Sequence, residues 1–198
     1  MADCFETHKS LAKPQECALL VVDVQERLID SIAKSQEVIA NIAALIKTAG
    51  LFQIPIVVTE QEKLGSTVPA LKELLQQGNA YEPITKQHFS CYPNEAFREA
   101  LKKTQRKYLL LVGIEAHICV GQTALDLLAN DYRIQVVADA VSSHDRQDHQ
   151  TAIKRLAKAG AIISSTEALI FELTAIAGSP PFKHVLTIVK DRRRSVDR

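Results

Sequence analysis

Short apolar runs alternate with amphipathic stretches along almost the whole chain, and this alternation limits the possible folds more than any other feature. Apolar runs of four to eight residues are typical of strands buried in a parallel sheet. They predict strands over Cys17–Val22, Ile54–Thr59, Ile84–Lys86, Tyr108–Val112, Ile134–Ala138 and Ala161–Ser164. Helices are predicted over Glu26–Thr48, Pro69–Gln77, from the cap Asn94 to Lys103, His117–Asn130, Arg146–Ala159, Thr166–Ala177 and Phe182–Val189. Alternation of this kind indicates right-handed βαβ units, so we predict a Rossmann-like three-layer α/β/α fold with a six-stranded parallel sheet.

Length and composition indicate one soluble domain over residues 1–198, with a core from about 15 to 175 and a C-terminal helix or tail over 180–198. A net charge of +1 argues against a large basic surface for binding membranes or nucleic acids. We expect a frayed, solvated tail where basic residues gather, at Lys190, Arg192, Arg193, Arg194 and Arg198. Without a secretory signal, a membrane span or paired cysteine spacing, a cytoplasmic protein with reduced thiols is expected.

Three reactive side chains follow predicted strands. Asp23 comes after the first strand, Lys86 ends the third, and Cys119 stands at the start of the helix after the fourth. Parallel sheets bind ligands at the carboxyl ends of their strands, so the three residues are expected to meet in one crevice. A helix N-terminus and a lysine both favour a thiolate, a carboxylate can take the thiol proton, and backbone N–H groups near Gly113 can receive an oxyanion.

The same residues also have plain structural interpretations. Asp23 is a suitable cap for the following helix, Lys86 is compatible with a surface position, and Cys119 with an inert buried thiol. The spacing alone does not decide between these alternatives.

Several ordered motifs together resemble the isochorismatase-like cysteine hydrolase superfamily. The likeness runs from about Ala18 to Leu173 and is carried by Leu19–Gln25, Ile84–Lys86, Val112–Val120 with Gln122–Ala124, and Val136–Ala140. The motifs Thr59–Gln61, Thr67–Leu71 and Ile114–Cys119 are similar to those of the small isochorismatase domain-containing proteins.

The resemblance implies roles for individual residues. Asp23 is then the base, Lys86 the positioning cation and Cys119 the nucleophile. A non-proline cis peptide is expected at Ile114–Glu115, with the N–H groups of Glu115 and Cys119 aimed at an oxyanion and no direct part for the Glu115 carboxylate. We expect the substrate pocket to include Gln25, Glu60, Gln61, Phe89, His117 and Ile118.

Two departures narrow the expected chemistry. Nicotinamidases of the superfamily carry metal-binding histidines after the second strand, whereas the stretch 59–65 here has no histidine, so we predict no metal and no other cofactor. True isochorismatases lack the nucleophilic cysteine, so Cys119 favours hydrolysis of an amide-like C–N bond through a thioester. The expected partners are a small-molecule substrate and further copies of the chain as a dimer or tetramer, without membrane or nucleic acid.

Other candidates stay open. His144, Asp145, Asp148 and His149 suggest a metal site or, with Ser142 and Ser143, plain capping of a helix. His117 lines the pocket mouth or only opens its helix, and Cys91 is a redox partner of Cys119, a pocket wall or a surface residue. A non-catalytic interaction protein that binds RNA through its basic tail is the alternative to an enzyme.

Overall fold

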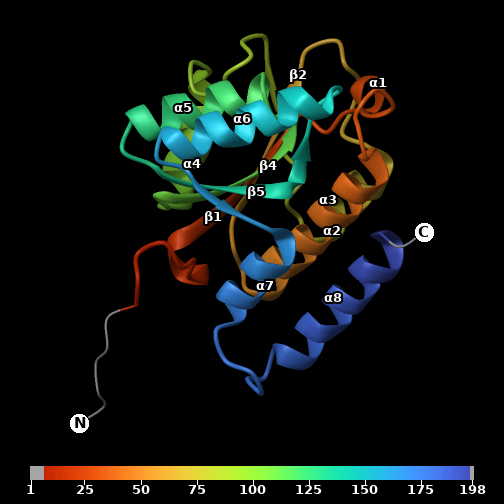
Figure 1. The fold of residues 1–198 in the computed structure, drawn as a ribbon, viewed down its shortest axis with the longest axis vertical. Helices are drawn as coiled ribbons and strands as arrows, with labels where there is room; N and C mark the ends of the chain where they lie inside the picture. Colours follow the sequence, from red (N-terminus) through yellow and green to blue (C-terminus); the bar gives the residue numbers. More distant parts are fainter. Residues whose placement is uncertain (1–6, 197–198) are drawn as a thin grey trace.

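The computed structural model describes residues 7–196, and six strands of this part form one parallel sheet in the order β3-β2-β1-β4-β5-β6 (Figure 1). The strands are β1 (Cys17–Val22), β2 (Ile56–Gln61), β3 (Ile84–Lys86), β4 (Tyr108–Ile114), β5 (Arg133–Ser142) and β6 (Ile162–Ser164). The predicted three-layer fold is confirmed. Strands β1 and β3 have the predicted bounds, whereas β2 begins and ends two residues later.

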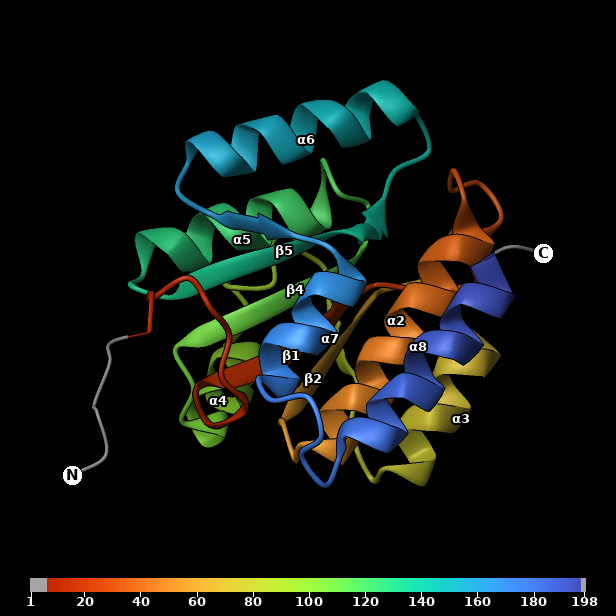
Figure 2. The ribbon, with the colours of Figure 1, turned by 60° about the horizontal axis from the view of Figure 1, so that its bottom comes forward.

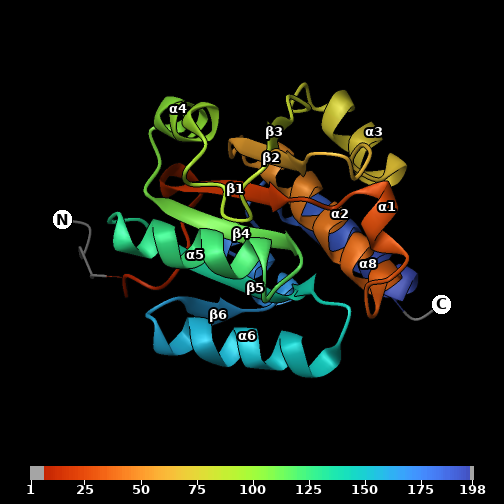
Figure 3. The same cartoon turned by 90° about the horizontal axis from the view of Figure 1, so that it is seen from above.

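Helices cover both faces of the sheet (Figures 2 and 3). One face carries α2 (Ser35–Leu51), α3 (Pro69–Gln77), α7 (Thr166–Thr174) and α8 (Phe182–Val196), with α8 lying on α2. The other face carries α4 (Glu95–Thr104), α5 (Cys119–Ala129) and α6 (Arg146–Lys158). Two short helices, η1 (Pro14–Glu16) and α1 (Glu26–Ile29), flank β1 in the chain.

The central strands are apolar throughout because both of their faces are buried. Along β1, Leu19 and Val21 pack on the α2 side, and Leu20 and Val22 pack on the α5 side. Side chains of a strand alternate between faces, so a strand covered twice has no polar position. This is why the carboxylate of the next residue, Asp23, is delivered directly to the edge of the sheet.

The predicted helix over Glu26–Thr48 is wrong in one respect, because the structure divides it into α1 and α2. Lys34, between the two helices, has a left-handed φ of 57°. The intervening backbone bonds to the end of β5 and the residue after it: Ala33 N–H donates to Ser143 O, and Ser142 Oγ donates to Ala33 O. These partners are distant in the sequence, which explains why periodicity alone indicates one continuous helix.

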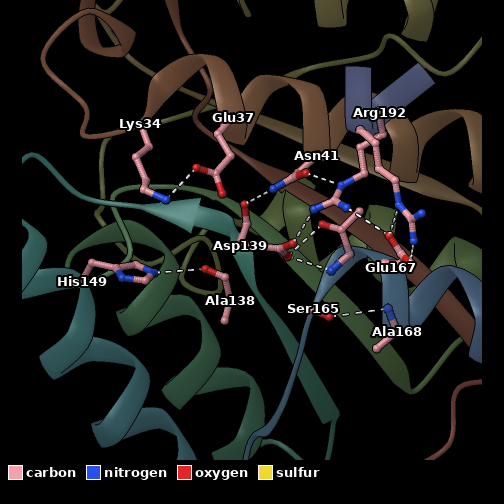
Figure 4. A network of polar contacts seen from close by, with 12 residues as sticks. Lys34, Glu37, Asn41, Ala138, Asp139, His149, Ser165, Glu167, Ala168 and Arg192 are labelled. Atoms are coloured by element: carbon pink, nitrogen blue, oxygen red, sulfur yellow. Dashed lines mark hydrogen bonds and ion pairs between the residues drawn. The ribbon is translucent and has the colours of Figure 1, made fainter. Parts of the chain in front are cut away.

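Strand β5 bulges near its end, and the bulge presents Asp139. Pairing passes from Leu111–Val136 to Gly113–Val141, so β5 contains extra residues between them. The Asp139 carboxylate accepts bonds from the N–H and hydroxyl of Thr166, and Arg192 of α8 donates to it at 3.0 Å (Figure 4). The Arg192 guanidinium also donates to Asn41 Oδ1 at 2.6 Å.

The expected fraying is wrong for the described residues, since α8 continues to Val196 and buries Val185 and Val189, whereas Lys190, Arg193 and Arg194 are exposed as predicted. Arg192 bonds to Glu167 (Figure 4), and so does Arg193. Arg198 lies outside the described residues. The apolar face of α8 and its anchored arginines attach the helix to α2 and α7.

Helix α6 is capped differently from the prediction. Asp145, rather than Ser142 or Ser143, accepts from the N–H groups of Gln147 and Asp148. The predicted cap of α4 by Asn94 is confirmed, with Phe97 N–H as donor. Within residues 7–196, we find no helix with the length and apolar character required to cross a membrane.

Candidate functional site

The three predicted reactive residues lie at the carboxyl edge of the sheet. Asp23 directly follows β1, Lys86 is the last residue of β3, and Cys119 is the first residue of α5. Strand β1 is paired with β2 on one side and with β4 on the other, so its end lies between loops from both halves of the sheet. Ligands of open parallel sheets bind at such positions.

Asp23 and Lys86 form a fully buried ion pair. Lys86 Nζ lies 2.6 Å from Asp23 Oδ2, and neither side chain is exposed. The ammonium also donates to Gln61 Oε1 at 2.7 Å and to His88 O at 3.1 Å, so three acceptors surround its three N–H bonds. Burial works against the charged form, but the Asp23 carboxylate outweighs it and raises the pKa of Lys86.

Cys119 interacts with both members of this pair. Its residue is 7% exposed, so the thiol lies just below the surface. Burial raises the pKa of the Cys119 thiol, the charge of Asp23 acts in the same direction, and Lys86 opposes them. We expected the lysine and the helix N-terminus to favour a thiolate. Instead, Asp23 already balances the lysine charge, and burial favours the protonated form of the Cys119 thiol.

Thr59 is a further member of the site; it begins the motif Thr59–Gln61, but the motif indicates no role for it. Its hydroxyl donates to Asp23 Oδ1 at 2.7 Å, so each carboxylate oxygen has its own donor. The Cys91 thiol lies 3.7 Å from the Thr59 hydroxyl oxygen, and Cys91 is fully buried rather than on the surface. The alternation of β2 was the available signal, because Thr59 and Gln61 share one side of the strand.

Gly113 permits the close approach of β4 to β1 beside Asp23. Its φ is 126°, and a Cβ at this position would lie 2.1 Å from Val22 O, a distance that no side chain can occupy. Further along, the peptide bond between Ile114 and Glu115 is cis. The turn thus carries the chain from the end of β4 to the first residue of α5 in close contact with β1.

Backbone N–H groups of this turn divide into two sets. Ala116 N–H donates to Ser142 O at 2.7 Å, and the N–H groups of Ile118 and Val120 both donate to Glu115 O. The N–H groups of Glu115 and Cys119 are not among these bonds. They are the pair that the sequence motifs indicate for an oxyanion.

Two of the residues expected to line the pocket, Gln25 and Glu60, instead form hydrogen bonds with neighbouring segments of the chain. Gln25 is buried, its amide donates to Gln61 O and Gly65 O, and its oxygen accepts from Gln61 N–H. Glu60 points away from Asp23, because its carboxylate accepts from Thr67 and Tyr81. Gln61 does reach the site and contacts Lys86 directly.

The remaining residues expected in the pocket differ in their exposure and contacts. Phe89 is 55% exposed, and Ile118 is partly buried against the α5 core. His117 bonds to Ser143 Oγ at 2.8 Å through Nδ1, which ties it to the loop before α6. The Glu115 carboxylate accepts from His144 N–H and so faces that loop, away from Lys86.

The histidine cluster before α6 is divided among separate partners. His144 Nδ1 contacts Ser31 O at 2.7 Å, and His149 Nε2 contacts Ala138 O at 3.1 Å. Over the described range 7–196, no group of three or more His, Cys, Asp or Glu side chains is arranged to hold a metal ion.

Comparisons with known proteins agree with this architecture. The isochorismatase domain profile matches residues 17–168. Isochorismatase domain-containing protein 2A of Mus musculus is 38% identical over 181 residues, covering 90% of this chain and 84% of the mouse protein. The secreted isochorismatase effector Isc1 of Phytophthora sojae is 38% identical, covering 90% of this chain and 86% of the effector. The solved structure of MAR1 ribonuclease from Caenorhabditis elegans has a TM-score of 0.82 at 38% identity and covers 91% of this chain and 93% of that one.

Proposed function

Because the chain belongs to the isochorismatase family, we propose that it is a cysteine hydrolase that cleaves an amide-like C–N bond in a small substrate. Family membership supports hydrolysis in general. The bond type rests on the side chains at the carboxyl edge of the sheet. A buried carboxylate–ammonium pair beside a thiol at a helix start provides a base, a positioning cation and a nucleophile.

Reaction begins with the thiol rather than with a free thiolate. The Asp23 carboxylate takes the Cys119 proton as the sulfur attacks the substrate carbonyl, and the S–C bond forms while the carbonyl becomes an oxyanion. Backbone N–H groups of Glu115 and Cys119 receive that oxyanion. Asp23 then returns the proton to the departing nitrogen, the C–N bond breaks, and a thioester remains on Cys119.

Water completes the cycle. Asp23 accepts a proton from the water that attacks the thioester, the C–S bond breaks, and the thiolate regains this proton while the carboxylic acid product leaves. Lys86 holds one oxygen of the carboxylate through the 2.6 Å contact and balances its charge within a fully buried pair. No redox change or external group is needed in either half of the reaction.

The observation that carries this proposal is the complete burial of the Asp23–Lys86 pair beside a nucleophile with little exposure. A buried ion pair is a weak source of stability, because desolvation consumes most of its attraction. Its presence at a ligand-binding edge of the sheet fits a chemical role better than a structural one. The slight exposure of Cys119 favours small substrates over polymers.

A screen of small primary amides with wild type and Cys119→Ala tests the proposal. Turnover of at least one amide by wild type, lost in Cys119→Ala, is the expected result. Cys17→Ala is the matched control, because Cys17 is also a free buried thiol but begins β1 at the opposite end of the strand. Wild-type rates in Cys119→Ala would overturn the mechanism.

RNA belongs in the same screen as a second substrate, because one similar solved structure is that of a ribonuclease. The basic tail gives this alternative little support, since Arg192 and Arg193 are bound to Glu167. RNA cleavage that persists in Cys119→Ala would indicate a separate activity. A dimeric or tetrameric assembly and a cytoplasmic location stay predictions, the first of which sedimentation analysis would test.

A further inference from the structure

The Asp23 carboxylate is held at both oxygens inside the protein. Lys86 occupies Oδ2 and the Thr59 hydroxyl occupies Oδ1, at 2.6 and 2.7 Å. Thr59 also accepts the Asp23 backbone N–H through its carbonyl oxygen at 3.1 Å. A carboxylate with one partner is free to turn about its last bond, whereas one with a donor at each oxygen has a single orientation.

The orientation of the Thr59 hydroxyl is itself determined by a second residue. A hydroxyl has one proton, so when it donates to Asp23 its oxygen is available as an acceptor. The Cys91 thiol lies 3.7 Å from that oxygen, and Cys91 is in turn anchored by its backbone N–H, which donates to Thr123 Oγ1 at 2.9 Å. Burial raises the pKa of the Cys91 thiol to about 11, so it retains its proton at neutral pH and can donate throughout.

We propose that Thr59 and Cys91 are positioning residues, which form a one-way hydrogen-bond relay from thiol to hydroxyl to the Asp23 carboxylate and keep that carboxylate aimed at Cys119. This inference rests on the proposed function, in which Asp23 is the proton acceptor. The charged or titratable groups facing Asp23 are Lys86 from β3, Cys91 from the loop after it and Cys119 from α5. The relay explains why a buried thiol without a catalytic part stands next to the site.

Loss of the Thr59 hydroxyl removes one of the two bonds that favour the ionised carboxylate. A hydrogen bond to a charged group is strong enough to move a titration by about one pH unit. The alkylation rate of Cys119 is expected to fall towards low pH, and we call this fall the acid limb of the profile. In Thr59→Val the acid limb should lie about one pH unit higher, with an alkylation rate about ten-fold lower at a given pH on that limb. Thr59→Ser, which keeps the hydroxyl, should recover most of the wild-type profile.

Alkylation by iodoacetamide measures this without any knowledge of the substrate. The sulfur of Cys119 forms a bond to the CH₂ carbon, iodide leaves, and the thiol proton passes to Asp23. Rates at Cys119 are followed by mass spectrometry of its peptide from pH 3 to 9 in wild type, Thr59→Val, Thr59→Ser, Cys91→Ala and Cys91→Ser. Cys91→Ala should move the limb in the same direction by a smaller amount, and Cys91→Ser should restore it.

Thr48→Val is the matched control for a lost buried hydroxyl, because Thr48 is fully buried in α2 and donates only to Ala44 O. Its Cys119 profile should equal that of wild type. A Thr59→Val profile that also equals wild type, or one shared by Thr48→Val, overturns the relay. If Thr59→Val does not fold, the Cys91 pair decides, and equal profiles for Cys91→Ala and Cys91→Ser overturn the part assigned to Cys91.

Asp23→Asn separates this inference from the proposed function. A changed Asp23→Asn profile with an unchanged Thr59→Val profile leaves Asp23 as base and refutes the relay alone. An Asp23→Asn profile identical to wild type refutes the basic role of Asp23 and the relay with it. A wild-type profile without an acid limb would likewise refute both the basic role of Asp23 and the relay.

Discussion

Replacement of Lys86 by Met should leave a charged carboxylate buried without its counter-ion. The Asp23 and Lys86 side chains are both completely buried and lie 2.6 Å apart, so water cannot replace the lost ammonium. Removal of one partner from a buried pair costs about 3–5 kcal/mol of unfolding free energy. In a domain of this size each kcal/mol lowers the melting temperature by roughly 2–4 °C, so we expect a decrease of about 6–20 °C.

A double-mutant cycle separates the pair from other effects of the substitution. Asp23→Asn with Lys86→Met removes both charges and should recover much of the stability lost in Lys86→Met, because a buried pair is nearly balanced by its desolvation. The free energy of unfolding in urea at pH 7 gives each corner of the cycle. Both the single and the double variant should lack hydrolase activity.

Lys102 provides the matched control. It forms an ion pair with Glu99 at 2.7 Å, close to the distance in the Asp23–Lys86 pair, but its side chain is 68% exposed. Lys102→Met should have no measurable effect, because water screens an exposed pair. Equal losses in Lys102→Met and Lys86→Met, or a double variant less stable than Lys86→Met, would refute the reasoning from burial.

Three further outcomes follow from the packing and the thiols. Gly113→Ala should destabilise the protein by at least about 3 kcal/mol in urea unfolding, since its Cβ would lie 2.1 Å from a backbone oxygen. Gly50→Ala, in open space within α2, should stabilise the protein by about 0.5–1 kcal/mol. Similar effects of the two substitutions would contradict the steric argument. Arg192→Met should speed amide hydrogen exchange in α8, because the contacts of the guanidinium with Asn41 and Asp139 are lost. Unchanged exchange rates would show that the apolar face alone holds the helix. Burial raises the pKa of Cys17 from 9.0 to about 12, so above pH 9 the folded state keeps a proton that the unfolded chain releases. The stability linked to this proton is therefore full below pH 9 and is lost between about pH 9 and 12. Thermal melts over this range should decline less steeply for Cys17→Ala, and parallel curves would exclude this contribution.

Much of the fold follows from local pattern. The runs Cys17–Val22 and Tyr108–Ile114 are apolar at every position because both faces of the central strands are covered, and this signal survives without any knowledge of the partners. Pro69 and Asn94 mark helix starts through short-range chemistry, a preset φ and a side-chain cap. Such features depend on neighbours within a few residues, which is why the sequence predicts them.

Long-range contacts decided the features that the sequence did not predict. The break before Ser35 is accompanied by bonds to Ser142 and Ser143, and Arg192 of α8 bonds to Asp139 in the bulge of β5. In both cases the partners are far apart in the sequence, so the hydrophobic periodicity of one segment does not predict the contact.

The reactive groups show the same division. Sequence motifs alone indicate which acid, ammonium and thiol to consider, since strand ends deliver Asp23, Lys86 and Cys119 to one edge. The pKa shifts of Lys86 and Cys119 were decided by the tertiary structure, because burial and the charges of neighbouring residues act only after folding. The donor from Thr59 likewise exists only where β2 lies beside β1, at a separation that sequence distance does not encode.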